Sequence, residues 1–117
     1  MESREMAKRI IDAMEEKKAE EIRVLDISEV SSLGDFFIIA SGNNQNQVQA
    51  IIDEIDERLG RAGVSPRQVE GYQNANWVLM DYGDVIVHVF DRENRLFYDL
   101  ERIWKDGKVI ATESLKD

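Results

Sequence analysis

Four aspartates stand at the ends of short apolar segments and are the side chains in this sequence best suited to hold a magnesium ion. They are Asp26, Asp35, Asp81 and Asp84. Carboxylate oxygens are ligands that magnesium prefers, so a site that gathered them could support phosphoryl chemistry. Acids at strand ends also form turns and cap helices, because their side chains bond to nearby backbone amides. We prefer this second interpretation and predict neither a metal site nor a cofactor.

The single histidine, His88, lies on the same face of a predicted strand as Asp84, so the two could form an Asp–His pair. Catalysis by such a pair would also require a nucleophile or a metal. Nothing in the sequence points to either, and the chain has no cysteine. We therefore interpret His88 as a hydrogen-bonded structural side chain.

The segment Ser41–Asn44 precedes a predicted helix and could place free amides around a phosphate. A P-loop requires Lys-Ser or Lys-Thr after its last glycine, and this segment has neither. The patterns G-x-G-x-x-G, H-E-x-x-H and G-x-S-x-G are also absent. The sequence predicts a binding protein, not an enzyme, and leaves a nucleotide-dependent transferase as the alternative.

The composition predicts one cytosolic domain. The 117 residues are 43% hydrophobic and 33% charged, enough for one core and a polar surface. We place the domain at residues 1–106 and a tail at residues 107–117, for which a flexible conformation is one reading. The first residues lack the apolar stretch of a signal peptide, and no apolar run approaches the roughly 20 residues of a membrane span. We expect no membrane association.

The net charge of -9, from 24 acidic and 15 basic residues, bears on the choice of partner. Binding to a phosphate backbone depends on clustered Lys and Arg, so we expect no direct, sequence-specific contact with nucleic acid. A basic protein partner suits the charge better, since opposite fields speed encounter. Acidity that serves solubility alone is the competing explanation.

Apolar periodicity predicts an α/β fold with a mixed β-sheet flanked by helices. The clearest pattern is one helical stripe after Asn44, formed by Val48, Ile51, Ile52, Ile55 and Leu59. Helices are expected over residues 3–19, from 44 to about 60, and over 92–104. Strands are expected over residues 21–27, 36–40, 67–70, 77–82 and 85–90. The last residues, 106–117, show no pattern.

The last two predicted strands form a hairpin around Gly83-Asp84. The register puts one apolar set on the face that packs against the helices. The opposite face pairs Asp81 with Ile86, Leu79 with His88 and Trp77 with Phe90. This second face is either covered, which makes Trp77 and Phe90 ordinary core, or partly open as a protein-binding patch. The residues alone leave both readings open.

Several segments in this order resemble the ribosomal silencing factor (Iojap-like) family. Residues 31–42 are similar to the family pattern S-S-x-x-D-x-F-I-I-x-S-G. The further matching segments are Asp26-Ile27, Gln47–Ile51, Glu70-Gly71, Trp77–Phe90 and Arg95–Trp104. Each segment is weak alone, but their order and spacing across residues 3–104 are specific.

The resemblance implies a nucleotidyltransferase-like fold without transferase activity. It also implies binding to the large ribosomal subunit through its protein L-fourteen, which blocks subunit joining and represses translation. The residues implied to contact that protein are Trp77, Leu79, Asp81, Tyr82, Tyr98, Asp99 and Glu101. Residues 70–101 contain seven acids and two basic residues, which suits a basic ribosomal protein.

The chain departs from the family pattern at two places. Asn44 stands where the family commonly has a small hydroxyl residue, so we assign that loop no role, and the segment after Trp104 is poorly matched. A homodimer formed through the Trp77 face is a third reading, which is compatible with ribosome binding if the two states share the surface.

Overall fold

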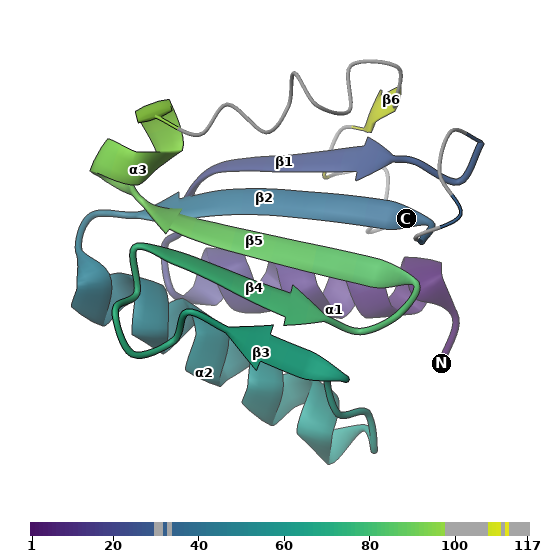
Figure 1. Cartoon of the computed structure of the whole chain (residues 1–117). Helices are drawn as coiled ribbons and strands as arrows, with labels where there is room; N and C mark the ends of the chain where they lie inside the picture. Colours follow the sequence, from purple (N-terminus) through teal and green to yellow (C-terminus); the bar gives the residue numbers. More distant parts are fainter. Residues whose placement is uncertain (30–31, 33, 98–107, 111, 113–117) are drawn as a thin grey trace.

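The fold consists of one mixed β-sheet with two long helices against one of its faces (Figure 1). The computed structural model describes residues 1–29, 32, 34–97, 108–110 and 112. The helices are α1 (Ser3–Glu16), α2 (Gln45–Arg61) and α3 (Arg92–Phe97). The strands are β1 (Glu20–Asp26), β2 (Phe36–Gly42), β3 (Gln68–Glu70), β4 (Trp77–Asp81), β5 (Val85–Asp91) and β6 (Lys108–Ile110). The sheet order is β3-β4-β5-β2-β1-β6, which confirms the predicted mixed α/β fold.

Helix α2 begins and ends where its sequence predicts. The Asn44 side chain accepts a hydrogen bond from the Gln47 amide at 2.9 Å, so it caps the first turn. The predicted apolar stripe is buried in full. Gly63 follows the C-terminus with a φ of 82°, the left-handed conformation that glycine adopts without strain. Helix α1 packs beside α2 and buries its own apolar side.

Strand β2 lies in the middle of the sheet, parallel to β5 and antiparallel to β1. All of its residues are buried. A continuously apolar sequence is typical of a strand that is covered on both faces. The strand predicted over residues 36–40 is confirmed, and it continues two residues further to Gly42.

Strands β4 and β5 form the predicted hairpin with the predicted register. The Tyr82 amide donates to the Val85 carbonyl at 3.0 Å, and Gly83 in the loop has a φ of 89°. The paired residues are Trp77 with Phe90, Val78 with Val89, Leu79 with His88, Met80 with Val87 and Asp81 with Ile86. Because side chains alternate along a strand, each pair lies together on one side of the sheet.

The two sides of the sheet have separate cores. We call the side covered by α1 and α2 the inner face and the opposite side the outer face. The inner core joins both helices to β2, β4 and β5 and contains most of the buried apolar residues. The outer core is smaller and consists of Leu25, Ile27, Phe37, Ile39 and Phe90, with Trp77 packed against it. None of the helices in the described part of the chain has the length and apolar character to cross a membrane.

The C-terminal part of the sequence differs most from its prediction. Of the helix expected over residues 92–104, the structure describes α3 (Arg92–Phe97), and Leu100, Ile103 and Trp104 lie outside the described residues. The segment after residue 106 carries no predicted element. The structure nevertheless shows β6 there, paired antiparallel with β1. Its three residues are too few to produce a recognisable alternating pattern.

Candidate protein-binding surface

The outer face is buried at its centre and partly exposed along β4. Phe90 has no exposed area and His88 is 5% exposed, whereas the neighbouring residues of β4 are half-buried. We call the half-buried group the outer strip; it consists of Trp77, Leu79, Asp81 and Ile86. Strand β3 extends this surface to the sheet edge, where exposed Gln68 pairs with Asp81 and exposed Glu70 pairs with Leu79.

Burial on the outer face differs from one residue of the hairpin to the next. Phe90 on β5 is an ordinary core residue, as the covered reading expects. Trp77 on β4 is half-buried, as the open reading expects. On the outer face the buried residues of β5 thus lie beside half-buried residues of β4, and Ile86 of β5 is also half-buried.

The Trp77 indole lies in a defined orientation. Its Nε1 donates a hydrogen bond to His88 Nδ1 at 2.9 Å. Its ring stacks against Phe90, with 5.3 Å between ring centroids and 26° between ring planes. Since Trp77 pairs with Phe90 and His88 pairs with Leu79, Trp77 and His88 are diagonal neighbours on adjacent strands. The register thus brings the indole and the imidazole within reach of each other.

His88 is a neutral, hydrogen-bonded side chain among aromatic rings. Its ring stacks on Phe37 with centroids 4.3 Å apart. Burial lowers the pKa of His88 from 6.5 to about 4, because the surroundings solvate the charged form poorly. Nδ1 accepts from the indole, so the proton of the neutral ring lies on Nε2. The prediction that His88 is a hydrogen-bonded side chain is confirmed, and the partner is Trp77.

Asp81 combines a turn contact with a surface position. One carboxylate oxygen accepts from the Gly83 amide at 2.7 Å. Its main-chain carbonyl accepts from the Arg67 amide, also at 2.7 Å. Asp26 similarly accepts from the Ser28 amide two residues later. These contacts confirm for both aspartates the role of turn former that their positions predict.

The implied contact residues do not all lie on one surface. Trp77, Leu79 and Asp81 share the outer strip. Tyr82 lies on the inner face, 7% exposed, within the core beneath the helices. Its hydroxyl is buried and has no hydrogen-bond partner among the described residues, and burial raises the pKa of Tyr82. Tyr82 lies on the other face from Asp81 because adjacent residues of a strand point to opposite sides of a sheet.

The other implied contacts, Tyr98, Asp99 and Glu101, lie outside the described residues. The register did place Ile86 opposite Asp81, but the family pattern did not single it out as a contact residue. The structure adds Ile86 to the strip because it is half-buried.

Neither of the two alternative chemical sites gains support from the structure. Across the described residues, no group of three or more His, Asp or Glu side chains could hold a metal ion. At the start of α2, the Asn43 amide donates to Gln47 Oε1 at 2.6 Å and the Gln47 amide donates to Asn44. The loop's own side chains thus occupy amides that a phosphate would need.

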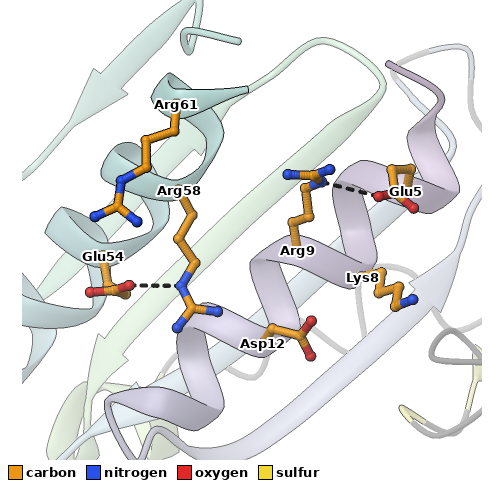
Figure 2. Close-up of a pocket in the computed structure, with 7 residues that line it drawn as sticks. All are labelled: Glu5, Lys8, Arg9, Asp12, Glu54, Arg58 and Arg61. Atoms are coloured by element: carbon orange, nitrogen blue, oxygen red, sulfur yellow. Dashed lines mark hydrogen bonds and ion pairs between the residues drawn. The ribbon is translucent and has the colours of Figure 1, made fainter. Parts of the chain in front are cut away.

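A groove of about 460 Å³ lies between α1 and α2, on the inner side of the sheet (Figure 2). Arg9 pairs with Glu5 at 3.1 Å and Arg58 pairs with Glu54 at 2.7 Å. The hydrogen bond from Arg58 holds the pKa of Glu54 below its ordinary value. The complete lining is Glu5, Lys8, Arg9, Asp12, Glu54, Arg58 and Arg61. Because acids and bases mostly neutralise one another here, we assign the groove no ligand.

Comparison with known proteins places this chain in a family. The family model described as "Ribosomal silencing factor during starvation" matches residues 1–117. A ribosomal silencing factor of Halalkalibacterium halodurans is 38% identical over 115 residues, which cover 98% of each chain. The chloroplastic protein Iojap of Zea mays is 33% identical over 84% of this chain and 42% of its own, longer chain.

A solved structure agrees with these sequence matches. The crystal structure of a Chromobacterium violaceum protein superposes with a TM-score of 0.87 at 39% identity, covering 90% of this chain and 88% of that one. A family model over the full chain, a relative of matching length and a shared fold point to the same conclusion. The chain belongs to the ribosomal silencing factor family.

Proposed function

We propose that this chain binds the large ribosomal subunit through a basic ribosomal protein, L-fourteen, and thereby blocks the small subunit from joining. Docking uses the outer strip, and repression of translation follows from occlusion, not from catalysis. The protein acts where ribosomes are, in the cytosol. The observation that supports this proposal best is the half-buried Trp77, held beside Leu79 and Asp81 on a face that α1 and α2 leave uncovered.

The chemistry of the strip suits a basic protein surface. Trp and Tyr anchors supply much contact area at small entropic cost, and interfaces concentrate their binding energy on such residues. Asp81 lies in the strip, Glu70 pairs with Leu79 beside it, and the net charge of the chain is -9. Among the described residues a cation also lies nearby, since the Arg67 guanidinium packs against Gly83 in the hairpin loop. The local excess remains acidic.

The direct test is co-sedimentation with purified large subunits, followed by addition of small subunits. We expect the chain to sediment with large subunits and to reduce the yield of joined ribosomes. Trp77→Ala should weaken large-subunit binding by about 2 kcal/mol, roughly thirtyfold, as truncation of an aromatic anchor does.

Tyr72→Ala is the matched control, because Tyr72 is also a half-buried aromatic but lies at the inner side, bonded to Asp53 on α2 at 2.9 Å. Its loss should lower stability without weakening ribosome binding. A folded Trp77→Ala protein that binds as tightly as the wild type would contradict the proposed anchor. A Trp77→Ala protein that unfolds would show that Trp77 is a core residue.

A further inference from the structure

The Trp77–His88 hydrogen bond joins a surface residue to a buried one. His88 is 5% exposed and stacks on Phe37, so its ring has little freedom to move. Trp77 is half-buried and carries a single polar group, the indole N–H, which His88 Nδ1 already accepts at 2.9 Å. The position of the acceptor is therefore set by the core, and the position of the donor follows from it.

We infer that His88 is a positioning residue for the outer strip, which fixes the Trp77 indole in one orientation and occupies its hydrogen-bond donor. What Trp77 presents to a partner is then aromatic ring surface and not an N–H group. The role in binding rests on the proposed function, whereas the orientation of the indole is a property of the free protein.

Preorganisation is the physical reason such a contact matters for binding. A side chain that is ordered before the partner arrives loses less conformational freedom on docking. Recognition surfaces depend on supporting residues that lock the contacting side chains, and the imidazole occupies that position here. Without an acceptor, the indole N–H would turn toward water and the ring would sample other rotamers.

The occupied donor also restricts the chemistry of the partner. A group placed over this indole gains nothing from being a hydrogen-bond acceptor. The groups that fit the ring are an aliphatic side chain or the stem and cationic head of Lys or Arg, which are attracted to the face of an indole. The acids beside the strip favour the cationic choice.

Two substitutions at His88 separate the acceptor from the ring. His88→Phe keeps an aromatic ring against Phe37 and Phe90 but removes the acceptor. His88→Asn removes the ring but retains an amide oxygen near the position of Nδ1. The first readout is the indole N–H resonance of Trp77 in the free protein, observed by nitrogen–proton NMR. We expect a shifted and more mobile indole in His88→Phe and a nearly native one in His88→Asn.

The second readout is binding to large ribosomal subunits. We expect His88→Phe to weaken binding about three- to tenfold, the range that corresponds to one neutral hydrogen bond, and His88→Asn to restore most of it. Replacing Trp77 by its sulfur isostere, benzothienylalanine, removes the N–H while keeping the ring. In a chain that carries this isostere, His88→Phe should cause no further loss of binding, because the hydrogen bond to His88 is already absent.

The outcomes separate this inference from the proposed function. A wild-type chain that does not bind large subunits contradicts the proposed function, and the NMR comparison still decides the positioning role. A His88→Phe protein with a native indole resonance and native affinity overturns the inference, even if its stability is lower. An added loss from His88→Phe in the isostere background overturns it as well.

Discussion

The imidazole of His88 illustrates how one buried side chain affects both stability and surface chemistry. Among the described residues, the rings of Phe37, Trp77 and Phe90 lie against it, and none of these three side chains titrates near neutral pH. The neutral ring can accept the indole N–H, whereas a fully protonated imidazole has no acceptor. Burial, which lowers the pKa of His88 to about 4, therefore also maintains the orientation of Trp77.

The same burial predicts a pH dependence of folding. The pKa of His88 is about 4 in the folded chain, against 6.5 as its ordinary value. Between these values the unfolded chain binds a proton that the folded chain does not. The stabilisation that neutral His88 contributes is thus complete above pH 6.5 and decreases as the pH drops toward 4. The expected loss from this residue is about 3 kcal/mol.

Urea unfolding of the wild type and of His88→Phe, from neutral pH to about pH 4, measures this contribution. Carboxylates titrate in both proteins, so the difference between the two unfolding free energies isolates the histidine. The free energy of unfolding of the wild type should therefore decrease relative to that of His88→Phe as the pH falls. A difference that stays constant with pH would contradict the prediction.

At the scale of the element, the short strand β4 carries most of the candidate surface. Its inner residues, Val78 and Met80, have no exposed area and anchor it to the core. Its outer residues are half-buried and supply three of the four residues of the outer strip. The start of the strand depends on Gly71, whose φ is 82° and whose backbone lies against the Trp77 carbonyl. This turn therefore helps to set where Trp77 begins the strand.

Gly71→Ala should destabilise the protein by more than the conformation of its backbone explains. An added Cβ would lie 2.2 Å from the Trp77 carbonyl oxygen, which forces the backbone to shift. Gly63 has the same φ of 82° but open space around it, so Gly63→Ala is the matched control. We expect about 1 kcal/mol for Gly63→Ala and about 1–3 kcal/mol more for Gly71→Ala, measured by urea unfolding. Equal decreases in the free energy of unfolding would show that the close approach of Gly71 to the Trp77 carbonyl does not affect stability.

At the scale of the whole molecule, charged side chains are arranged differently on the two sides of the sheet. The inner side carries α1 and α2 with their internal ion pairs, such as Arg58–Glu54. The outer strip combines apolar groups with the acid Asp81, which suits the basic partner proposed above. With a net charge of -9, the entire chain contributes a long-range field to the encounter.

Ionic strength should therefore act mainly on the association rate. Binding of the chain to the isolated basic ribosomal protein, followed by stopped flow, should slow on the order of tenfold from low to high salt, with a much smaller change in the dissociation rate. Trp77→Ala should show the opposite pattern, since loss of a packed anchor accelerates dissociation. An association rate that salt leaves unchanged would argue against a charge-steered encounter.

Local patterns were sufficient to predict much of this fold. The stripe of α2, its Asn44 cap and the register of the β4–β5 hairpin follow from spacing and turn chemistry, and the structure confirms them. The short strand β6 is not predicted, because its pairing with β1 is a long-range contact that a pattern of three residues does not indicate. Local periodicity carries no information about such partners.

By itself, the sequence determined which side chains share the outer face, because alternation along a strand is a local rule. Only the tertiary structure decided which of them remain at the surface. Phe90 is sealed while its partner Trp77 is half-buried, and Tyr82 belongs to the inner core. Burial depends on which segments pack over a position, and those segments are distant along the chain. The Trp77–His88 bond likewise required the pairing of two strands before its atoms could meet.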